Sequence, residues 1–356
     1  MREVSQSQRR HVIRTAAVLL ALVAAGLAVL LIAERSGSQR HGKPATARTS
    51  CEGSAALCAR RLNEVVFAGT HNSYAASAQP GWHFASQRYG ISRQLDAGIR
   101  ALLLDVHFGV YDRDTGRVRT DLTAEGSDRN KVAKQVPPRA LRLADRLAGR
   151  VGVGTLAGTP ELYLCHTLCE LGADPLNREL KAIGSFLAEH PAQVLIAIVE
   201  DYIPPPAIER AFAQAGLERY LVTLNRHAPL PTLGELIDQD HRLVVFAEQD
   251  GGTPAWYMPA FSFIQDTPLG AVRPDQLSCA RYRGEADSPL LLINHWIPPF
   301  PPSQSLNAGI GHTAFLRRRV RRCLEQRGFR GAIVAVDFYQ RTSVVAVAKE
   351  LNSDSG

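Results

Sequence analysis

Residues 65–74 read VVFAGTHNSY, an apolar run that ends in Gly-Thr and presents His71 and Asn72 side by side. A short, continuously apolar run is typical of a strand that a parallel sheet buries on both faces. Comparable runs recur along the chain: IRALLLDVHFG, ELYLCH, QVLIAIVEDY, HRLVVFAE, SPLLLINHW and GAIVAVDFY. The repetition of this pattern, more than any single run, indicates the fold.

Helix-like patterns fill the intervals between these runs. They lie near residues 91–97, 176–190, 205–216, 232–239, 311–327 and 342–351. Strands that alternate with helices indicate a parallel sheet covered on both faces. Seven or eight such units over about 300 residues fit a closed barrel better than an open sheet. We therefore predict an α/β fold, a TIM-like (β/α) barrel over residues 61–352, regular or irregular.

Nearly every apolar run finishes in polar or ionisable side chains. In a β/α barrel the carboxyl ends of the strands converge on the active site, so residues scattered in the sequence become one cluster in space. Singly, each would more often be a capping or otherwise satisfied polar group, and it is their joint occurrence that indicates a site. The set comprises His71, Asn72, Asp105, His107, His166, Glu200, Asp201, Asn294, His295 and Asp337.

Two histidines on different strands, His71 and His166, suit acid–base catalysis. Imidazole titrates near neutral pH, so one ring can remove a proton while the other donates one. Asp337 ends the last strand, which lies beside the first strand if the barrel closes. There its carboxylate would orient His71 and stabilise the charge on the ring.

Three side chains with hard oxygen donors, Asn72, Asp105 and Glu200, accompany the histidines. Such a set favours Ca²⁺ or Mg²⁺ over zinc. A divalent cation would neutralise phosphate charge during displacement at phosphorus. Strand alternation places Asp105 and His107 on one face and Arg100 on the other, which predicts a structural role for Arg100. The residues alone indicate phosphodiester cleavage by paired histidines, with or without a metal.

Several motifs together resemble a known family. GTHNSY, LDAGIRALLLDVH, LYLCHTLCELG, VLIAIVEDYI, LLINHW and AVDFY occur in the order seen in phosphatidylinositol-specific phospholipase C X-domain-like proteins. These are PLC-like phosphodiesterases with a TIM-barrel-like fold. The likeness runs from about Asn63 to Asn352, and THNSY with a later LCH and VEDY is a specific combination.

The resemblance implies a role for each histidine. His71 would take the proton from a hydroxyl next to the phosphate, which is the inositol 2-OH when phosphatidylinositol is cleaved, and the freed oxygen would attack phosphorus to form a cyclic phosphodiester. His166 would protonate the departing diacylglycerol oxygen. Asp337 resembles the aspartate that supports the first histidine. The implied substrate is a phospholipid or another phosphodiester.

The resemblance leaves metal dependence open. Asn72, Asp105 and Glu200 match three ligand positions of calcium-dependent members, but Leu103 stands where a further carboxylate is expected. Calcium would then bind weakly, use Asp201 or water, or be absent.

Four residues are candidates for contacts with the substrate: His107, Asp201, Asn294 and Tyr339. His107 stands where metal-independent members carry an arginine, and it is a poor substitute as a permanent charge. Tyr339 matches a position at which bacterial relatives stack an aromatic ring on a sugar. Trp296 lines a headgroup pocket, touches the membrane or packs in the core.

The amino-terminal region predicts a membrane anchor. Residues 15–33, TAAVLLALVAAGLAVLLIA, carry no charge, and as a helix they span about 28 Å, near the thickness of a bilayer's hydrocarbon core. A cleaved signal peptide is the alternative, although its apolar part is usually about 7–15 residues long. We predict a basic cytoplasmic stretch at 1–14, a single-pass anchor at 15–33 and an extracytoplasmic linker at 34–60.

All six cysteines follow the apolar segment, which indicates disulfides in an oxidising compartment. Six cysteines permit fifteen pairings, and nearness along the chain favours Cys51–Cys58, Cys165–Cys169 and Cys279–Cys323. Free thiols are the alternative, and zinc is disfavoured because no CxxC pair is present. We predict a cell-membrane protein with an extracytoplasmic catalytic domain, or a secreted protein if the segment is cleaved.

The charge of the chain does not favour nucleic acid as a partner. The net charge is +7, but residues 1–50 alone hold eight Lys or Arg and two Glu, so the remainder is close to neutral. Residues 111–160 form an insertion rich in Arg, Asp and Gly, which is a lid, a partner surface or a plain surface insertion.

Two other functions stay open. One is a phosphodiesterase for glycerophosphodiesters or choline lipids, although that related barrel family typically follows its first histidine with Arg-Gly. The other is a catalytically inactive barrel that binds lipid or glycan. The missing carboxylate at Leu103 slightly favours an inactive barrel, whereas His71 and His166 argue against it.

Overall fold

The computed structural model of the chain describes residues 50–121, 158–166, 168–298 and 302–354. All of them belong to one compact unit, Arg48–Gly356. The predicted basic stretch, anchor and first part of the linker lie outside the described residues. Within the described ranges, no helix is long and apolar enough to cross a membrane.

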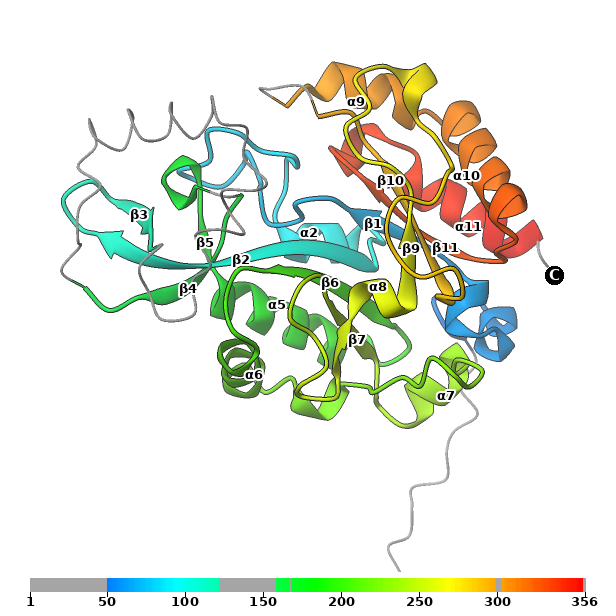
Figure 1. Ribbon diagram of the computed structural model, residues 1–356, viewed down its shortest axis with the longest axis horizontal. Helices are drawn as coiled ribbons and strands as arrows, with labels where there is room; N and C mark the ends of the chain where they lie inside the picture. Colours follow the sequence, from blue (N-terminus) through cyan, green and yellow to red (C-terminus); the bar gives the residue numbers. More distant parts are fainter. Residues whose placement is uncertain (1–49, 122–157, 167, 299–301, 355–356) are drawn as a thin grey trace, which may run out of the picture. The chain divides into compact units, whose positions relative to one another are not determined.

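Eight parallel strands form the central sheet, as predicted for an α/β fold (Figure 1). Their order in space is β8, β7, β6, β2, β1, β11, β10, β9, so neighbours in the sheet follow one another in the chain, except that the first strand, β1, lies beside the last, β11. The strands are β1 (Val66–Thr70), β2 (Ala101–Asp112), β6 (Leu195–Asp201), β7 (Leu243–Ala247), β8 (Tyr257–Pro259), β9 (Ile264–Asp266), β10 (Leu290–His295) and β11 (Ala332–Val336).

The predicted closed barrel is only partly formed. β8 pairs with β7 and β9 pairs with β10, but the described residues show no pairing between β8 and β9. These two strands are three residues long and are separated by the single turn of α8 (Ala260–Phe263). The ring of hydrogen bonds is therefore interrupted there, because the short connection carries helix in place of a ladder.

The helices follow the predicted pattern closely. The six predicted segments correspond to α2, α5, α6, α7, α10 and α11, whereas the single turn of α8 and helix α9 are not predicted. Local signals set their ends: Thr232 and Glu235 form a capping box at the start of α7, and Gly328, at φ 69°, ends α10. The bounds are α2 (Ile91–Asp96), α5 (Leu176–Glu189), α6 (Pro205–Gln214), α7 (Leu233–Asp238), α9 (Gln304–Gly311), α10 (Thr313–Arg327) and α11 (Val344–Asp354).

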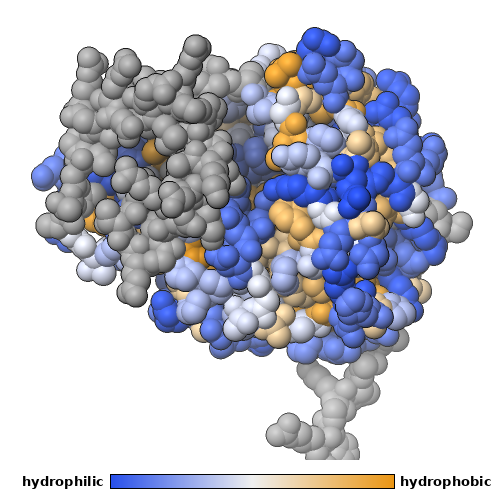
Figure 2. Space-filling view, viewed as in Figure 1, coloured by the Kyte–Doolittle hydropathy of each residue, from blue (hydrophilic) through white to orange (hydrophobic). Residues whose placement is uncertain are grey.

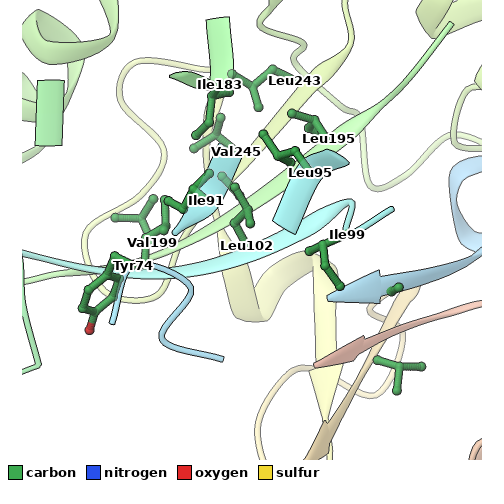
Figure 3. Close-up of a cluster of buried hydrophobic side chains, with 14 of the residues drawn as sticks. Tyr74, Ile91, Leu95, Ile99, Leu102, Ile183, Leu195, Val199, Leu243 and Val245 are labelled. Atoms are coloured by element: carbon green, nitrogen blue, oxygen red, sulfur yellow. The ribbon is translucent and has the colours of Figure 1, made fainter. Parts of the chain in front are cut away.

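The strands bury side chains on both faces, which explains their continuous hydrophobicity. On the outer face, Leu102 of β2 and Val199 of β6 pack with side chains of α2 such as Leu95 (Figure 3). On the inner face, Leu103 and Ile198 belong to a second cluster. Because side chains alternate along a strand, residues two positions beyond these inner ones also face inward, at the carboxyl end.

An antiparallel extension grows from β2, and it corrects one prediction. β2 pairs with β3 (Arg117–Thr120) and β4 (Glu161–Leu164), and β4 also pairs with β5 (Asp174–Pro175). ELYLCH was expected to be a strand of the parallel barrel, but it forms β4, outside that sheet. The reason is that β2 is twelve residues long and continues past its parallel neighbours. Residues 122–157 of the predicted insertion lie outside the described residues.

The predicted linker at 34–60 extends too far into the folded domain. Cys51 and Leu57 are buried, and residues 55–59 form a 3₁₀ helix. The Glu52 carboxylate accepts bonds from Arg100 at 2.8 Å and from the Val194 backbone N–H at 2.7 Å. Arg100 therefore has the predicted structural role, and residues 51–60 are part of the domain.

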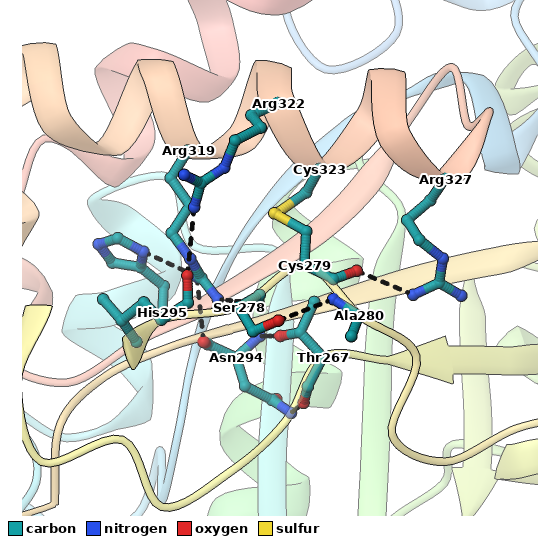
Figure 4. Close-up of a disulfide and its surroundings, with 11 residues drawn as sticks. Thr267, Ser278, Cys279, Ala280, Asn294, His295, Arg319, Arg322, Cys323 and Arg327 are labelled. Atoms are coloured by element: carbon teal, nitrogen blue, oxygen red, sulfur yellow. Dashed lines mark hydrogen bonds between the residues drawn. A yellow bond between two sulfur atoms is a disulfide. The ribbon is translucent and has the colours of Figure 1, made fainter. Parts of the chain in front are cut away.

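The three predicted disulfides, Cys51–Cys58, Cys165–Cys169 and Cys279–Cys323, are all present. The third joins the segment after β9 to α10 (Figure 4). Beside it, Arg319 donates to the carbonyl oxygens of Ser278 and Asn294 at 3.0 and 3.1 Å. The carboxyl end of β10 is thus tied to α10.

On the face shown in Figure 2, hydrophobic side chains form small groups among hydrophilic ones. The large hydrophobic residues exposed in the described part of the chain are Tyr111, Leu269, Val272 and Tyr282. Most apolar residues of the predicted strands therefore lie in the two core clusters.

Candidate active site

Sheet order brings the candidate residues of four strands to one edge. β6, β2, β1 and β11 are consecutive neighbours in the sheet. Asp105 of β2 stands opposite Glu200 of β6, and Thr70 of β1 stands opposite Val336 of β11. His71 and Asp337 directly follow this second pair, so they emerge side by side.

His71 and Asp337 form the first histidine–aspartate pair. The His71 Nδ1 atom lies 2.9 Å from Asp337 Oδ1. Burial raises the pKa of Asp337, and the charge and hydrogen bond of His71 oppose that rise. With Nδ1 donating to the carboxylate, Nε2 carries the lone pair that can accept a proton.

Packing also fixes the His71 ring. The Trp296 ring, just after β10, stacks on it with centroids 4.0 Å apart and planes 4° from parallel. The His71 side chain is 21% exposed. The structure thus places Trp296 directly against the candidate base.

A buried amide, Gln87, supports the same strand ends. Its Nε2 donates to the carbonyl oxygens of His71 at 2.8 Å and Val336 at 3.0 Å, and its Oε1 accepts from the Tyr339 N–H at 3.1 Å. Nothing in the sequence pattern distinguishes Gln87, because its partners lie in two distant segments.

His166 and Asp105 form the second pair. The His166 Nδ1 atom lies 3.1 Å from Asp105 Oδ2, and the His166 side chain is 61% exposed. Burial would raise the pKa of Asp105, but the hydrogen bond and charge of His166 outweigh it, and this pKa is lowered. Desolvation would lower the pKa of His166, but Asp105 outweighs it, and this pKa is raised. The pair thus favours a protonated His166.

Asn72 lies between the two pairs. Its Nδ2 is 3.4 Å from His166 Nδ1, and its Oδ1 accepts from the Tyr74 hydroxyl at 3.2 Å. Its φ is 43°, in the left-handed region that asparagine tolerates better than most residues. Asn72 thus places its side-chain amide beside His166 while the preceding residue, His71, bonds Asp337.

The donor set predicted for calcium does not fit a calcium site. Asp105 is bonded to His166, the oxygen of Asn72 accepts from Tyr74, and Glu200 accepts from the Tyr202 hydroxyl. Among the described residues, no three Asp, Glu, His or Cys side chains come together as metal ligands. The expected further ligand is replaced by Leu103, which packs in the inner cluster. Two carboxylates with internal partners fall short of the six to eight oxygens that Ca²⁺ takes.

Two of the predicted substrate contacts have other roles in the structure. Asp201 is buried and accepts the backbone N–H groups of Gln249 at 3.0 Å and Asp250 at 3.1 Å, so it stabilises the loop after β7. Tyr339 packs in the outer cluster, and its hydroxyl donates to the Arg93 carbonyl at 3.4 Å. These contacts argue against the predicted stacking of Tyr339 on a sugar.

The other two lie closer to the carboxyl-end cluster but are buried. His107 stacks on Tyr202 with centroids 4.3 Å apart, and burial lowers its pKa to about 4. It is therefore neutral near pH 7 and does not replace an arginine. Asn294 donates to the Thr267 carbonyl at 2.6 Å and to Asp266 at 3.3 Å. His295, the remaining residue of the predicted set, bonds the Ile310 carbonyl through Nε2 and Arg319 through Nδ1. Burial lowers its pKa to about 3.

Sequence reasoning missed a charged group on the neighbouring strands. Arg283 bonds Glu248 at 2.7 Å and Asp266 at 2.9 Å. Burial raises the pKa of Glu248 to about 7. Glu248 ends the run HRLVVFAE and could have been found by the rule used for the other strands. Asp266 could not, because three-residue β9 has no visible pattern, and Arg283 lies in an irregular segment.

The PI-PLC X family model, described as PI-PLC X 1, matches residues 155–352, more than half of the chain. The chain belongs to the PI-PLC X family. The resemblance noted in the motifs is thereby confirmed. The PI-PLC X match includes His166 and Asp337, whereas His71 and Asp105 precede it.

Two curated PI-PLC X relatives are similar in sequence. A PI-PLC X domain-containing protein of Arabidopsis thaliana is 26% identical over 218 residues, 55% of this chain and 49% of its own length. The chain therefore matches about half of that relative. PI-PLC X domain-containing protein 1 of Arthroderma benhamiae is 22% identical over 370 residues, 98% of this chain and 99% of its own.

Solved structures also resemble this PI-PLC X chain. The phosphatidylinositol-specific phospholipase C of Listeria monocytogenes gives a TM-score of 0.45 at 16% identity, covering 83% of this chain and 97% of its own. The enzyme of the same name from Staphylococcus aureus gives 0.48 at 11% identity, covering 82% and 94%.

Proposed function

We propose that this protein is a phosphodiesterase of the phospholipase C type, acting on phosphatidylinositol or a related phosphodiester. One observation carries the proposal: two histidine–aspartate pairs, His71–Asp337 and His166–Asp105, meet at the carboxyl end of the parallel sheet. A base and an acid on separate strands are what internal displacement at phosphorus requires.

His71 supplies the base. Its Nε2 accepts the proton of the hydroxyl next to the phosphate, the 2-OH in phosphatidylinositol, and that oxygen attacks phosphorus to form a cyclic phosphodiester. The ring becomes an imidazolium, and the Asp337 carboxylate at Nδ1 stabilises its charge. The stacked Trp296 keeps the ring in one orientation during this step.

His166 supplies the acid. With Nδ1 bonded to Asp105, its Nε2–H is free to protonate the departing oxygen, so the diacylglycerol leaves as a neutral alcohol. Its raised pKa keeps it protonated to higher pH than an ordinary histidine. Water can then open the cyclic product with the two roles reversed.

We expect no calcium requirement, because the oxygen donors near the pairs have internal partners. The location of the domain also remains our proposal: an extracytoplasmic domain on a membrane anchor at 15–33. Three disulfides support the oxidising compartment.

Phosphorus NMR of the full chain with phosphatidylinositol in mixed micelles tests the proposal. We expect a cyclic inositol phosphate signal, equal with calcium and with chelator. His71→Ala and His166→Ala should abolish the signal, whereas His227→Ala, at an exposed position, should not.

Parallel samples hold phosphatidylcholine and glycerophosphoinositol. Turnover of either of these alone would replace the proposal with the glycerophosphodiester or choline-lipid activity. Binding of phosphatidylinositol micelles without turnover of any substrate would indicate an inactive binding module.

A further inference from the structure

The candidate acid lies inside a small covalent ring. Cys165 and Cys169 flank His166 and form a disulfide with Cα atoms 5.0 Å apart. Both half-cystines are buried, at 0% and 2% exposure, and pack with Val118 and Tyr163. The exposed His166 side chain thus projects from a loop that is closed by a buried disulfide.

The backbone N–H of each half-cystine bonds a different strand, β2 for Cys165 and β3 for Cys169. The Cys165 N–H donates to the Asp105 carbonyl at 3.3 Å, so its position is tied to the residue that bonds His166. The Cys169 N–H donates to Thr120 Oγ1 at 2.8 Å, and the N–H and hydroxyl of Thr120 bond Glu170, both at 2.9 Å. The disulfide joins these two anchored points across the loop that carries His166.

Among the described residues, few polar groups hold the ring of His166. Its contacts in the described structure are Asp105 at 3.1 Å and Asn72 at 3.4 Å, both at Nδ1. No aromatic ring packs on it within the described ranges, whereas Trp296 stacks on His71. A ring with two polar contacts at one atom depends on its backbone for orientation.

We propose that the Cys165–Cys169 disulfide is a positioning element that holds His166 against Asp105 for the acid step. The inference rests on the proposed function in assigning His166 as the acid. A dithiol reagent reduces this disulfide by passing two electrons and two protons to its sulfurs. The products are the two cysteine thiols and the oxidised reagent. The loop then loses its clamp while the parallel sheet stays intact, so reduction impairs the acid step before it impairs the fold.

The test compares Cys165→Ser/Cys169→Ser with Cys51→Ser/Cys58→Ser, which removes another short disulfide, of Cα separation 5.1 Å, in the amino-terminal segment. Both are assayed as full chains in micelles on phosphatidylinositol and on nitrophenyl phosphoinositol. Nitrophenolate leaves as a stable anion and does not need the acid. Carbon-13 NMR of labelled histidine follows the titration of His166, assigned by its loss in His166→Ala.

We expect the 165/169 variant to lose at least tenfold on the lipid, with little loss on the nitrophenyl ester, and the His166 titration to move to lower pH. The 51/58 variant should show neither change. Equal losses on both substrates with an unmoved titration, or no loss, overturn the proposal. If the 165/169 variant does not fold, Thr120→Val, which frees the Cys169 N–H, takes its place. A loss of about fivefold on the lipid with little loss on the nitrophenyl ester then supports the proposal, and equal losses on both substrates, or no loss, overturn it. If the parent chain turns over neither substrate, the proposed function fails, and the titration alone decides the positioning.

Discussion

His71 and His166 each bond an aspartate through Nδ1, but different parts of the fold hold the two rings. His71 follows a central strand, and its surroundings include Asp337, the stacked Trp296 and the buried Gln87. His166 is 61% exposed and stands on a disulfide-closed loop of the antiparallel extension. The proposed base thus lies among packed core side chains, whereas the proposed acid lies on a loop closed by a disulfide, so the two should respond differently to the same kind of change.

Removal of the carboxylates should give the largest difference in activity between the two histidine–aspartate pairs. We expect Asp337→Asn to lower kcat/KM by about 10³-fold and Asp105→Asn by about 10²-fold, within the usual range for acid–base groups. The largely buried His71 must gain a charge that Asp337, bonded at Nδ1, balances, whereas water reaches the exposed His166. Steady-state assays with the exposed Asp287→Asn as a control decide this. A larger loss for Asp105→Asn would contradict the comparison.

The pH dependence should distinguish the acid. Because Asp105 raises the pKa of His166, the protonated acid persists to higher pH in the parent chain. In Asp105→Asn that support is lost, so the alkaline limb of the kcat/KM profile should move to lower pH. Rates measured from about pH 5 to 9 check the shift. An unmoved alkaline limb would mean that His166 does not supply the proton.

Loss of the Trp296 ring, which stacks on His71, should lower activity less than loss of a carboxylate does. We expect Trp296→Leu to lower kcat by up to about tenfold, since aromatic pairs contribute about 0.5–1.5 kcal/mol beyond burial. Trp296→Phe should recover part of the rate. Trp256→Leu is the control for a general loss of stability, because Trp256 packs against Phe212 just before β8. Full activity in Trp296→Leu would show that Asp337 alone orients His71.

The smallest loss of activity should follow removal of the Thr120 hydroxyl, which accepts a hydrogen bond from the Cys169 N–H. Thr120→Val removes the acceptor of the Cys169 N–H while leaving the disulfide in place. One buried hydrogen bond is worth about 1 kcal/mol, which corresponds to about fivefold in rate if the whole effect falls on His166. Kinetics and thermal unfolding measured together show whether the rate falls without a matching loss of the folded state.

Much of the fold is visible in local patterns. The alternation of apolar runs with helix-like segments predicted six helices and six of the eight parallel strands, because burial on both faces leaves continuous hydrophobic stretches. Three-residue strands such as β8 and β9 leave no such signal. ELYLCH has the composition of a buried strand, and only its partner, the overlong β2, makes it antiparallel.

The candidate site divides in the same way. The sequence by itself determined which chemical groups end the strands, including His71, His166 and Asp337, since strand ends are read from local hydrophobicity. Tertiary structure decided their partners: Asp105 bonds His166, and Tyr339 turns into the core. His71 and Asp337 are 266 positions apart, and their pairing was predicted only by assuming that the first and last strands become neighbours; the structure confirms it with a contact of 2.9 Å. Pairing at that separation depends on sheet order and packing, which exist only in the folded chain.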